Sequence, residues 1–422
     1  MTTRPLFGLL SCFMLAACSS SGASPAQGGG TDSGSPAADD GGTDDGSSSL
    51  LAPPAAGQGI QYTMQTTIAA STEDERCKFV QTTEDMWVNH EDVRYTPGSH
   101  HFILWNTPYT SIPTTNNQGE TVDTTQVFDC VGGPAAAWNT SQLVGGAQAA
   151  DAPPALSDLP ATVALHIPSG SVLVMDLHVL NVSMAPLDPV VLINLDTIPK
   201  SQVTQEAGMF FFYNPFIVVP PNASAKAHMS CPVTSDVTLA TVQTHMHKWG
   251  LGGVVNLEDS TGAQVQQLYT STVWTDPPVT QWPSPGMALT AGQQIDYECN
   301  YENTGTTEVI QGLSAATNEM CVLLGAYYPR DTKFESCSTT GNFNDESSAA
   351  TYIGSGTTSC SDSLTCLGSA TTDASFFSCM VDSCPGAAVP LTAALACFNA
   401  NSNNAQTACA TQAAQCIEAT CN

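Results

Sequence analysis

Five of the eight histidines in this 422-residue chain lie in three short arrangements that could bind a metal ion. They are the adjacent pair His100 and His101, the single His178, and the pair His245 and His247. Side chains on a strand repeat every two residues, so His245 and His247 would present both imidazoles on one face. Two imidazole nitrogens on one face suit zinc or copper. Alone, this pattern is equally typical of a polar strand face without a metal.

The other two arrangements are weaker signals when each is taken alone. His100 and His101 point to opposite faces of a strand, so both could bind one metal only at a bulge or an irregular strand end. Pro97 and Gly98 directly before them could supply that irregularity. His178 lies among leucine and valine residues, which is typical of a hydrogen-bonded core histidine. Three further histidines are interpreted as ordinary residues: His90, His166 and His228.

Short strands and turns must position these histidines. Runs rich in β-branched residues, bounded by Pro-Gly, Pro-Pro and Asn-Thr-Gly turns, predict strands, and no long helical periodicity occurs before residue 360. Three such runs cover residues 172–180, 190–195 and 239–247. The predicted fold is all-β, with two antiparallel, jelly-roll-like β-sandwich domains over residues 58–203 and 204–340.

The composition excludes several kinds of function. The chain has 38 acidic and 9 basic residues, a net charge of −29, so it lacks the basic surface that neutralises the phosphates of a nucleic acid. The same charge disfavours binding to an anionic membrane surface. Sixteen cysteines are too many for a reducing compartment, and with only 11% charged residues they indicate a β-rich extracellular protein.

The N-terminus predicts a bacterial lipoprotein. An apolar stretch too short to span a bilayer ends in small residues, so residues 1–17 are predicted to be a signal peptide. Leu15-Ala16-Ala17-Cys18 resembles the lipobox, which predicts lipidation of Cys18; the alternative is an ordinary signal peptide that contains a cysteine. Residues 18–57 are predicted to be a disordered, acidic Gly/Ser/Pro tether. The lipid would be the only membrane anchor, and Ser19 favours the outer membrane of a cell envelope, on its periplasmic or its outer face.

The remaining cysteines form two groups. Six are spread over the two predicted β domains: Cys77, Cys130, Cys231, Cys299, Cys321 and Cys337. Eight crowd into the last 63 residues, a density typical of a disulfide scaffold: Cys360, Cys366, Cys379, Cys384, Cys397, Cys409, Cys416 and Cys421.

A separate C-terminal module is predicted from the second group. We predict a linker over residues 341–358 and a small, disulfide-rich helical module over residues 359–422. Its cysteine spacing repeats after 37 residues, which predicts two helical hairpins, each held by its own disulfides. The module contains no histidine, so a chain ending near Ala350 should fold and keep its metals. Its role as a spacer, a docking module or a surface cap stays open.

Four short motifs occur in order along the chain. They are Gly98-Ser99-His100-His101-Phe102-Ile103-Leu104, the run from Pro168-Ser169-Gly170-Ser171 to Leu177-His178, Thr244-His245-Met246-His247, and Asn318-Glu319-Met320-Cys321-Val322 followed by Tyr327-Tyr328-Pro329. Through these motifs, residues 60–337 resemble the copper type II, ascorbate-dependent monooxygenases, the family of dopamine β-hydroxylase and peptidylglycine α-hydroxylating monooxygenase.

The resemblance implies two copper ions that face each other across a solvent-filled cleft. The ligands of the first, electron-storing copper would be His100, His101 and His178. The ligands of the second, catalytic copper would be His245, His247 and Met320. A thioether sulfur is a soft ligand that favours Cu(I) over zinc, so the second set agrees with copper. The resemblance also implies three disulfides: Cys77–Cys130, Cys231–Cys337 and Cys299–Cys321.

The predicted function is therefore hydroxylation of a C–H bond in a small or peptide-like organic substrate, with dioxygen and an ascorbate-like reductant. In the peptide-hydroxylating branch, an arginine, a tyrosine and an asparagine hold the substrate carboxylate. The chain has Gln243, Leu324 and Val322 at those positions, so a C-terminal carboxylate is not favoured. The alternative is a non-catalytic copper-binding or surface-interaction lipoprotein. All six ligand positions are filled, which favours the enzyme.

Overall fold

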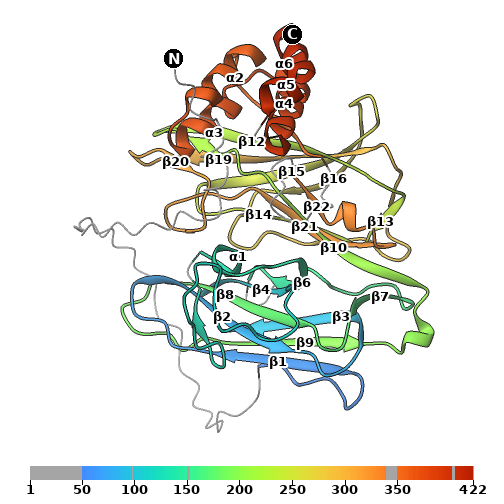
Figure 1. Ribbon diagram of the computed structural model, residues 1–422. Helices are drawn as coiled ribbons and strands as arrows, with labels where there is room; N and C mark the ends of the chain where they lie inside the picture. Colours follow the sequence, from blue (N-terminus) through green and yellow to red (C-terminus); the bar gives the residue numbers. More distant parts are fainter. Residues whose placement is uncertain are drawn as a thin grey trace.

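The computed structural model describes residues 50–96, 98–130, 132–149, 153–338, 349–401 and 404–421. Over these ranges the protein consists of β-sheets with a small helical region at the C-terminal end (Figure 1). The prediction of an all-β chain with a disulfide-rich helical module is confirmed. The predicted signal peptide, Cys18 and residues 19–49 of the tether lie outside the described residues. No helix within the described ranges is both long and apolar enough to cross a membrane.

The first domain is a sandwich of two antiparallel sheets. One sheet has the order β5-β2-β8-β4-β6. Its strands are β2 (Thr72–Gln81), β4 (Ser99–Asn106), β5 (Phe128–Asp129), β6 (Gln142–Ala147) and β8 (Val172–Asn181). The other sheet begins with β1 (Gly59–Gln65), β9 (Val190–Thr197), β3 (Met86–Tyr95) and β7 (Val163–Ile167), in that order. Between β5 and β6 the chain forms the short helix α1 (Pro134–Ala137).

Strand β8 explains how the first sandwich presents polar side chains at a buried place. Alternate residues over 173–179 point into the core between the two sheets. The opposite face of the strand begins with Val172 and Val174, which join a small apolar cluster. The same face continues with Asp176 and His178, and both are buried. One strand thus supplies the core on one side and a buried polar site on the other.

The second domain is a similar sandwich and shares a sheet with the first. Strand β10 (Gln205–Tyr213) pairs in parallel with β7, so one sheet continues through β10, β21, β13 and β18. The strands of this part are β13 (Val237–Leu239), β14 (Thr241–His245), β17 (Thr280–Gln281), β18 (Met287–Leu289), β21 (Val322–Tyr328) and β22 (Ser336–Cys337). The predicted boundary between residues 203 and 204 therefore falls just before a strand that joins the two domains. It does not separate two independent sheets.

The outer sheet of the second domain has the order β16-β15-β19-β12-β23. Its strands are β12 (Ala223–Pro232), β15 (Gly250–Glu258), β16 (Gln264–Ser271), β19 (Gln294–Asn303) and β23 (Thr351–Ile353). A short ladder of β11 (Val218–Val219) and β20 (Val309–Ile310) lies beside it. Strand β23 falls inside residues 341–358, where the sequence predicts only a linker. This part of the linker range belongs to the second domain.

Over its described residues, 360–401 and 404–421, the C-terminal module forms five α-helices. They are α2 (Cys360–Ser369), α3 (Asp373–Val381), α4 (Ala388–Ala400), α5 (Ala405–Ala408) and α6 (Ala410–Glu418). Two disulfides, Cys366–Cys379 and Cys397–Cys409, lie within the predicted repeats. The other two, Cys360–Cys416 and Cys384–Cys421, join one repeat to the other. The prediction of two hairpins each held by its own disulfides is therefore wrong, because α2 and α4 both pack against α6 in one bundle.

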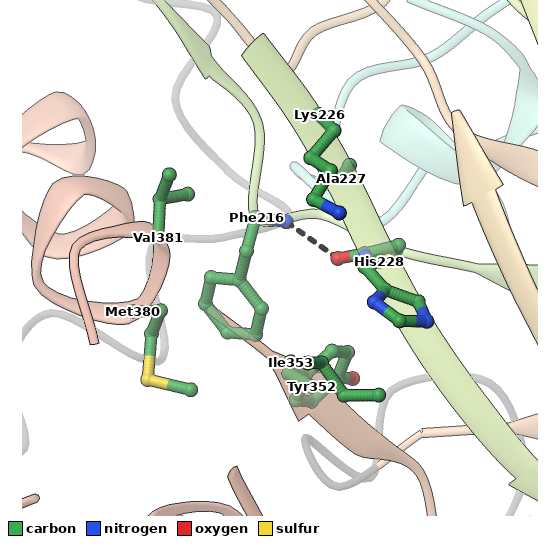
Figure 2. A pocket seen from close by; sticks show the side chains of 9 residues that line it. Phe216, Lys226, Ala227, His228, Tyr352, Ile353, Met380 and Val381 are labelled. Carbon is green, nitrogen blue, oxygen red and sulfur yellow. Dashed lines mark hydrogen bonds between the residues drawn. The ribbon is translucent and has the colours of Figure 1, made fainter. Parts of the chain in front are cut away.

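The module packs directly against the second domain. The ring of Phe216 lies 4.5 Å from that of Tyr352 in β23, and 6.1 and 6.0 Å from those of Phe376 and Phe377 in α3. Figure 2 shows Phe216 between β12 and the end of α3, where a small pocket opens at the seam. All four aromatic residues belong to the apolar core of the second sandwich. The predicted module therefore shares an apolar core with the second domain, since the seam buries aromatic rings from both sides.

We expect peptide mapping of the unreduced protein to recover seven disulfides. Four of them lie within the module, and three lie in the β domains: Cys77–Cys130, Cys231–Cys337 and Cys299–Cys321. The Cα–Cα distances of these three are 5.7, 6.0 and 5.8 Å, within the range that a disulfide spans. They are the pairs that the family resemblance implies. A peptide that joins a module cysteine to a β-domain cysteine would contradict this pattern.

Candidate metal centre

The first histidine set lies where β4 pairs with β8. His101 is directly opposite His178 in this antiparallel ladder, and the register shifts between Ser99 and His101. The shift is a bulge at His100, the irregularity that the sequence requires if adjacent histidines are to share one site. The ring centroids of His100, His101 and His178 lie 4.9 to 5.2 Å apart. One ligand nitrogen from each ring lies within 4.8 Å of the others.

The second set lies at the end of β14. His245 is the last residue of this strand, and His247 lies in the turn that leads to β15. The Glu319 carboxylate accepts hydrogen bonds from the backbone N–H groups of His247 (2.9 Å) and Trp249 (2.6 Å). The prediction that one strand carries both histidines is wrong, because these bonds divert the backbone into a turn. The two rings still lie close together, with centroids 5.2 Å apart.

The two sets adjoin each other. His100 lies 5.3 Å from His245 and 5.5 Å from His247 between ring centroids, and His101 lies 5.1 Å from His245. His100 can share a metal either with the first set or with His245 and His247. We call these five residues the histidine cluster: His100, His101, His178, His245 and His247. The arrangement differs from the resemblance, which implies two sites separated by a solvent-filled cleft.

Hydrogen bonds from the second set orient its rings. His245 donates through Nδ1 to Oε1 of Gln148 (2.6 Å), and the Gln148 amide in turn donates to the carbonyl of Thr244 (2.8 Å). His247 donates through Nδ1 to the carbonyl of Asn318 (3.1 Å). Both rings therefore present Nε2 as the nitrogen with a free lone pair. Gln148 comes from the first domain, so this contact also ties the domains together.

His178 is oriented through its other nitrogen. It donates through Nε2 to the Glu73 carboxylate (2.9 Å), which leaves Nδ1 to face a metal. Burial acts to raise the pKa of Glu73, but hydrogen bonds from His178 and Ser314 outweigh it and lower the pKa to about 2. Glu73 is therefore a carboxylate at neutral pH.

The nitrogens of the cluster suit a metal ion. Four buried nitrogens have no hydrogen-bond partner: Nε2 of His100, Nδ1 of His101, Nε2 of His245 and Nε2 of His247. A buried polar atom without a partner costs about 1–3 kcal/mol, so the four nitrogens together fit a bound metal ion. Burial also lowers the pKa of His247 to about 4 and those of His100, His101 and His245 well below the usual range. Neutral imidazole is the form that binds a metal.

Met320 lies two residues beyond Asn318, whose carbonyl accepts the Nδ1–H of His247. Its carbonyl accepts a hydrogen bond from the Tyr301 hydroxyl (2.9 Å), and the next residue, Cys321, is fixed by its disulfide to Cys299. The Met320 side chain is partly buried and packs against the apolar cluster between the sheets of the first domain. Its backbone is thus held on both sides, next to the segment that bonds His247. Its role as a ligand stays a prediction.

A buried carboxyl pair lies beside His101. Glu75 and Asp176 belong to neighbouring strands, and their oxygens lie within 4.8 Å of a His101 nitrogen. Burial and the neighbouring Asp176 raise the pKa of Glu75 well above its usual range, although the backbone N–H groups of Gly132 (2.9 Å) and Gly133 (2.6 Å) donate to it. Burial likewise raises the pKa of Asp176 to about 6. The pair can therefore hold a proton next to the first set.

The three histidines interpreted as ordinary residues lie in other pairings. His90 contacts Asp158 (2.8 Å), His166 contacts Asp85 (2.8 Å) and His228 contacts Asp296 (2.7 Å). His90 also lies within reach of Asp92 and Asp196, but this group is partly exposed. None of the three lies in the histidine cluster.

Three residues around the cluster were missed by sequence reasoning. Glu319 lies within the fourth motif, between Asn318 and Met320, but the motif alone assigns it no role. Glu73 lies in a charged run, Thr72–Arg76, that is typical of a solvated strand. Gln148 follows a Gly-Gly-Ala stretch without any pattern. The positions of Glu73 and Gln148 matter only because the two domains meet there.

Comparison with known proteins finds a family match for the second domain. Residues 205–349 match the family described as copper type II ascorbate-dependent monooxygenase, C-terminal domain. The match contains His245, His247 and Met320, together with both cysteine pairs of the second sandwich. No individually curated protein matches the chain. Residues 205–349 are therefore similar to the C-terminal domain of the copper type II, ascorbate-dependent monooxygenase family.

Proposed function

We propose that the protein is a copper monooxygenase that hydroxylates a C–H bond of a small or peptide-like organic substrate. It would use dioxygen and an ascorbate-like reductant. The observation that carries the proposal is the histidine cluster: five adjoining imidazoles, four of them with a buried, unpaired nitrogen, in a chain whose residues 205–349 match this family. Neutral imidazoles with free lone pairs can bind a metal cation.

The donor types favour two copper ions. His100, His101 and His178 would hold one copper. His245 and His247 would hold the other with Met320, whose soft sulfur favours Cu(I). When bound, copper supplies one-electron transfer and dioxygen chemistry, so no organic cofactor is needed.

The chain's own residues prepare this chemistry. Glu73, Gln148 and Asn318 each accept the N–H of one imidazole, so the opposite ring nitrogens are fixed toward the metals. Four of the five histidines are buried, and Trp274 lies 6.1 Å from His100 between ring centroids. These side chains exclude bulk water, which protects a reactive site from side reactions.

The surroundings of the second set favour an uncharged substrate group. Gln243 is buried, pairs opposite Leu324 and donates a hydrogen bond to the carbonyl of Pro277 (2.8 Å). The nearest cation along the chain is Lys248, which is exposed and lies over the ring of Trp249. A substrate carboxylate would find no positive partner at Gln243, so we propose a substrate without a C-terminal carboxylate at this position.

The cellular setting is also part of the proposal. A cleaved signal peptide and a lipid on Cys18 would hold the enzyme at the bacterial cell envelope, on the outer membrane. The net charge of −29 keeps the protein itself off an anionic membrane surface, so the lipid would be its only membrane contact. The seven disulfides agree with an oxidising compartment.

Anaerobic loading of the soluble chain with copper tests the proposal. We expect two coppers per chain by elemental analysis, one after His101→Ala or His247→Ala, and two after His166→Ala. His166 is the matched control, because it pairs with Asp85 outside the cluster. The loaded chain should consume oxygen with ascorbate and an uncharged substrate. Uptake of zinc in preference to copper, or of no metal at all, would contradict the assignment.

A further inference from the structure

Glu73 contacts both domains at the edge of the histidine cluster. It lies on β2 in the first domain, and its carboxylate accepts the Nε2–H of His178 (2.9 Å). The same carboxylate accepts the hydroxyl of Ser314 (2.6 Å) and the backbone N–H of Ala315 (2.5 Å), which belong to the second domain. The His178 side chain is only 4% exposed and that of Glu73 is 20% exposed, so water competes little for these bonds.

The contact with His178 decides which ring nitrogen faces a metal. A carboxylate accepts but does not donate, so Nε2 of His178 must carry the proton. Nδ1 then keeps its lone pair. A carboxylate behind a ligand histidine fixes the ring orientation and raises the basicity of the ligand.

The contacts with Ser314 and Ala315 hold the turn that leads to Met320. The hydroxyl oxygen of Ser314 accepts hydrogen bonds from the backbone N–H groups of Ala316 and Thr317, each at 3.2 Å. The backbone carbonyl of Ser314 accepts a hydrogen bond from the N–H of Asn318 (2.9 Å). The carbonyl of Asn318 accepts the Nδ1–H of His247. Hydrogen bonds and one short turn thus connect His178 of the first set to His247 of the second.

We propose that Glu73 is a positioning residue for both ligand sets. It orients His178 directly and, through the 314–318 turn, fixes the approach of His247 and Met320. This inference rests on the proposed function, because it treats the histidines as metal ligands. It goes beyond that function because a carboxylate in the first domain would then control how tightly the second domain binds its metal. The domains would then bind their metals as a coupled pair.

The first test uses the metal-free protein. Nitrogen NMR of the His178 ring should show the Nε2–H form in the wild type, and Glu73→Gln should shift it toward the Nδ1–H form, because an amide can also donate. The amide signal of Ala315 and the ring signals of His247 should move in the same variant. Asp296→Asn is the matched control, because it removes an equal charge from another His–carboxylate pair, His228–Asp296, outside the cluster.

The second test uses copper alone as the probe. Glu73→Gln should weaken Cu(II) binding by the first set and Cu(I) binding by the second, each by about 10–100-fold, while Asp296→Asn changes neither. Ser314→Ala removes the hydroxyl but keeps Glu73 on His178. It should therefore weaken mainly the second set and leave the His178 tautomer unchanged. Melting temperatures of all variants show whether each remains folded.

The outcomes separate the two proposals. If Glu73→Gln affects only the first set, or behaves like Asp296→Asn at both, the positioning role across the domains is overturned while the enzyme assignment stands. If the wild-type chain takes up no copper, the proposed function fails. The metal-free signals of His178, Ala315 and His247 then still decide whether Glu73 orients both sets, and unchanged signals in Glu73→Gln would overturn that role.

Discussion

Replacing Met320 by alanine is expected to abolish oxygen-dependent hydroxylation and to leave His245 and His247 able to hold Cu(II). Cu(I) prefers a soft thioether ligand more strongly than Cu(II) does, so the substitution should weaken mainly the binding of Cu(I). We expect Cu(I) affinity at the second set to drop by more than the ~10–100-fold that loss of an outer-sphere partner costs. Cu(I) titration under anaerobic conditions and an ascorbate-driven oxygen assay measure the two effects. The first set should keep its copper.

Met209→Ala is the matched control for this change. Met209 packs in the same apolar cluster as Met320, is 1% exposed, and is not a proposed ligand. Its loss should cost about 2–5 kcal/mol of unfolding free energy through a cavity, without weakening Cu(I) binding by the folded protein. If Met320 were only a packing residue, Met320→Ala would resemble Met209→Ala. A lower melting temperature with unchanged Cu(I) affinity would rule out the ligand role.

The sequence is informative where local pattern decides the structure. The run rich in β-branched residues predicts the strand over 172–180, and the two-residue repeat of a strand then places Asp176 and His178 on the face opposite Leu177. The bulge at His100 could be inferred because adjacent histidines cannot otherwise share a face. The Cys299–Cys321 pair was implied only by the family resemblance, since spacing alone does not fix connectivity.

The sequence is uninformative where distant segments meet. Glu73 and Ser314 are separated by 241 residues, and no periodicity in either segment predicts their hydrogen bond. The sequence predicts both histidines of the H-x-H pair on one strand. In the structure the buried Glu319 carboxylate accepts hydrogen bonds from the N–H groups of His247 and Trp249, and the strand ends at His245. The cleft implied by the resemblance is a property of domain placement. In this chain, contacts such as Gln148 with His245 bring the two sets together.

The contact between the C-terminal module and the second domain is another that the sequence does not predict. Removing the module is expected to lower the stability of the second domain strongly. The sequence predicts that a chain ending at Ala350 keeps its fold, but that chain would lack β23 and the helices that cover Phe216. Exposing the buried side chain of Phe216 costs about 1.5–3 kcal/mol. Strand β12 would also become an unpaired edge of its sheet. We expect the melting transition of the second domain to fall by about 10 °C or more.

The copper sites should respond unequally to this truncation. The second set depends on β14 and β21, which pack over the apolar core that Phe216 shares, while the first set is held by β4 and β8 in the other sandwich. Copper should therefore be lost first from His245 and His247. A chain ending at Gly354 is the matched control, because it keeps Tyr352 against Phe216 and should recover part of the stability. Equal stability and two coppers in the chain ending at Ala350 would mean that the seam contributes nothing, and that the module is dispensable as the sequence predicts.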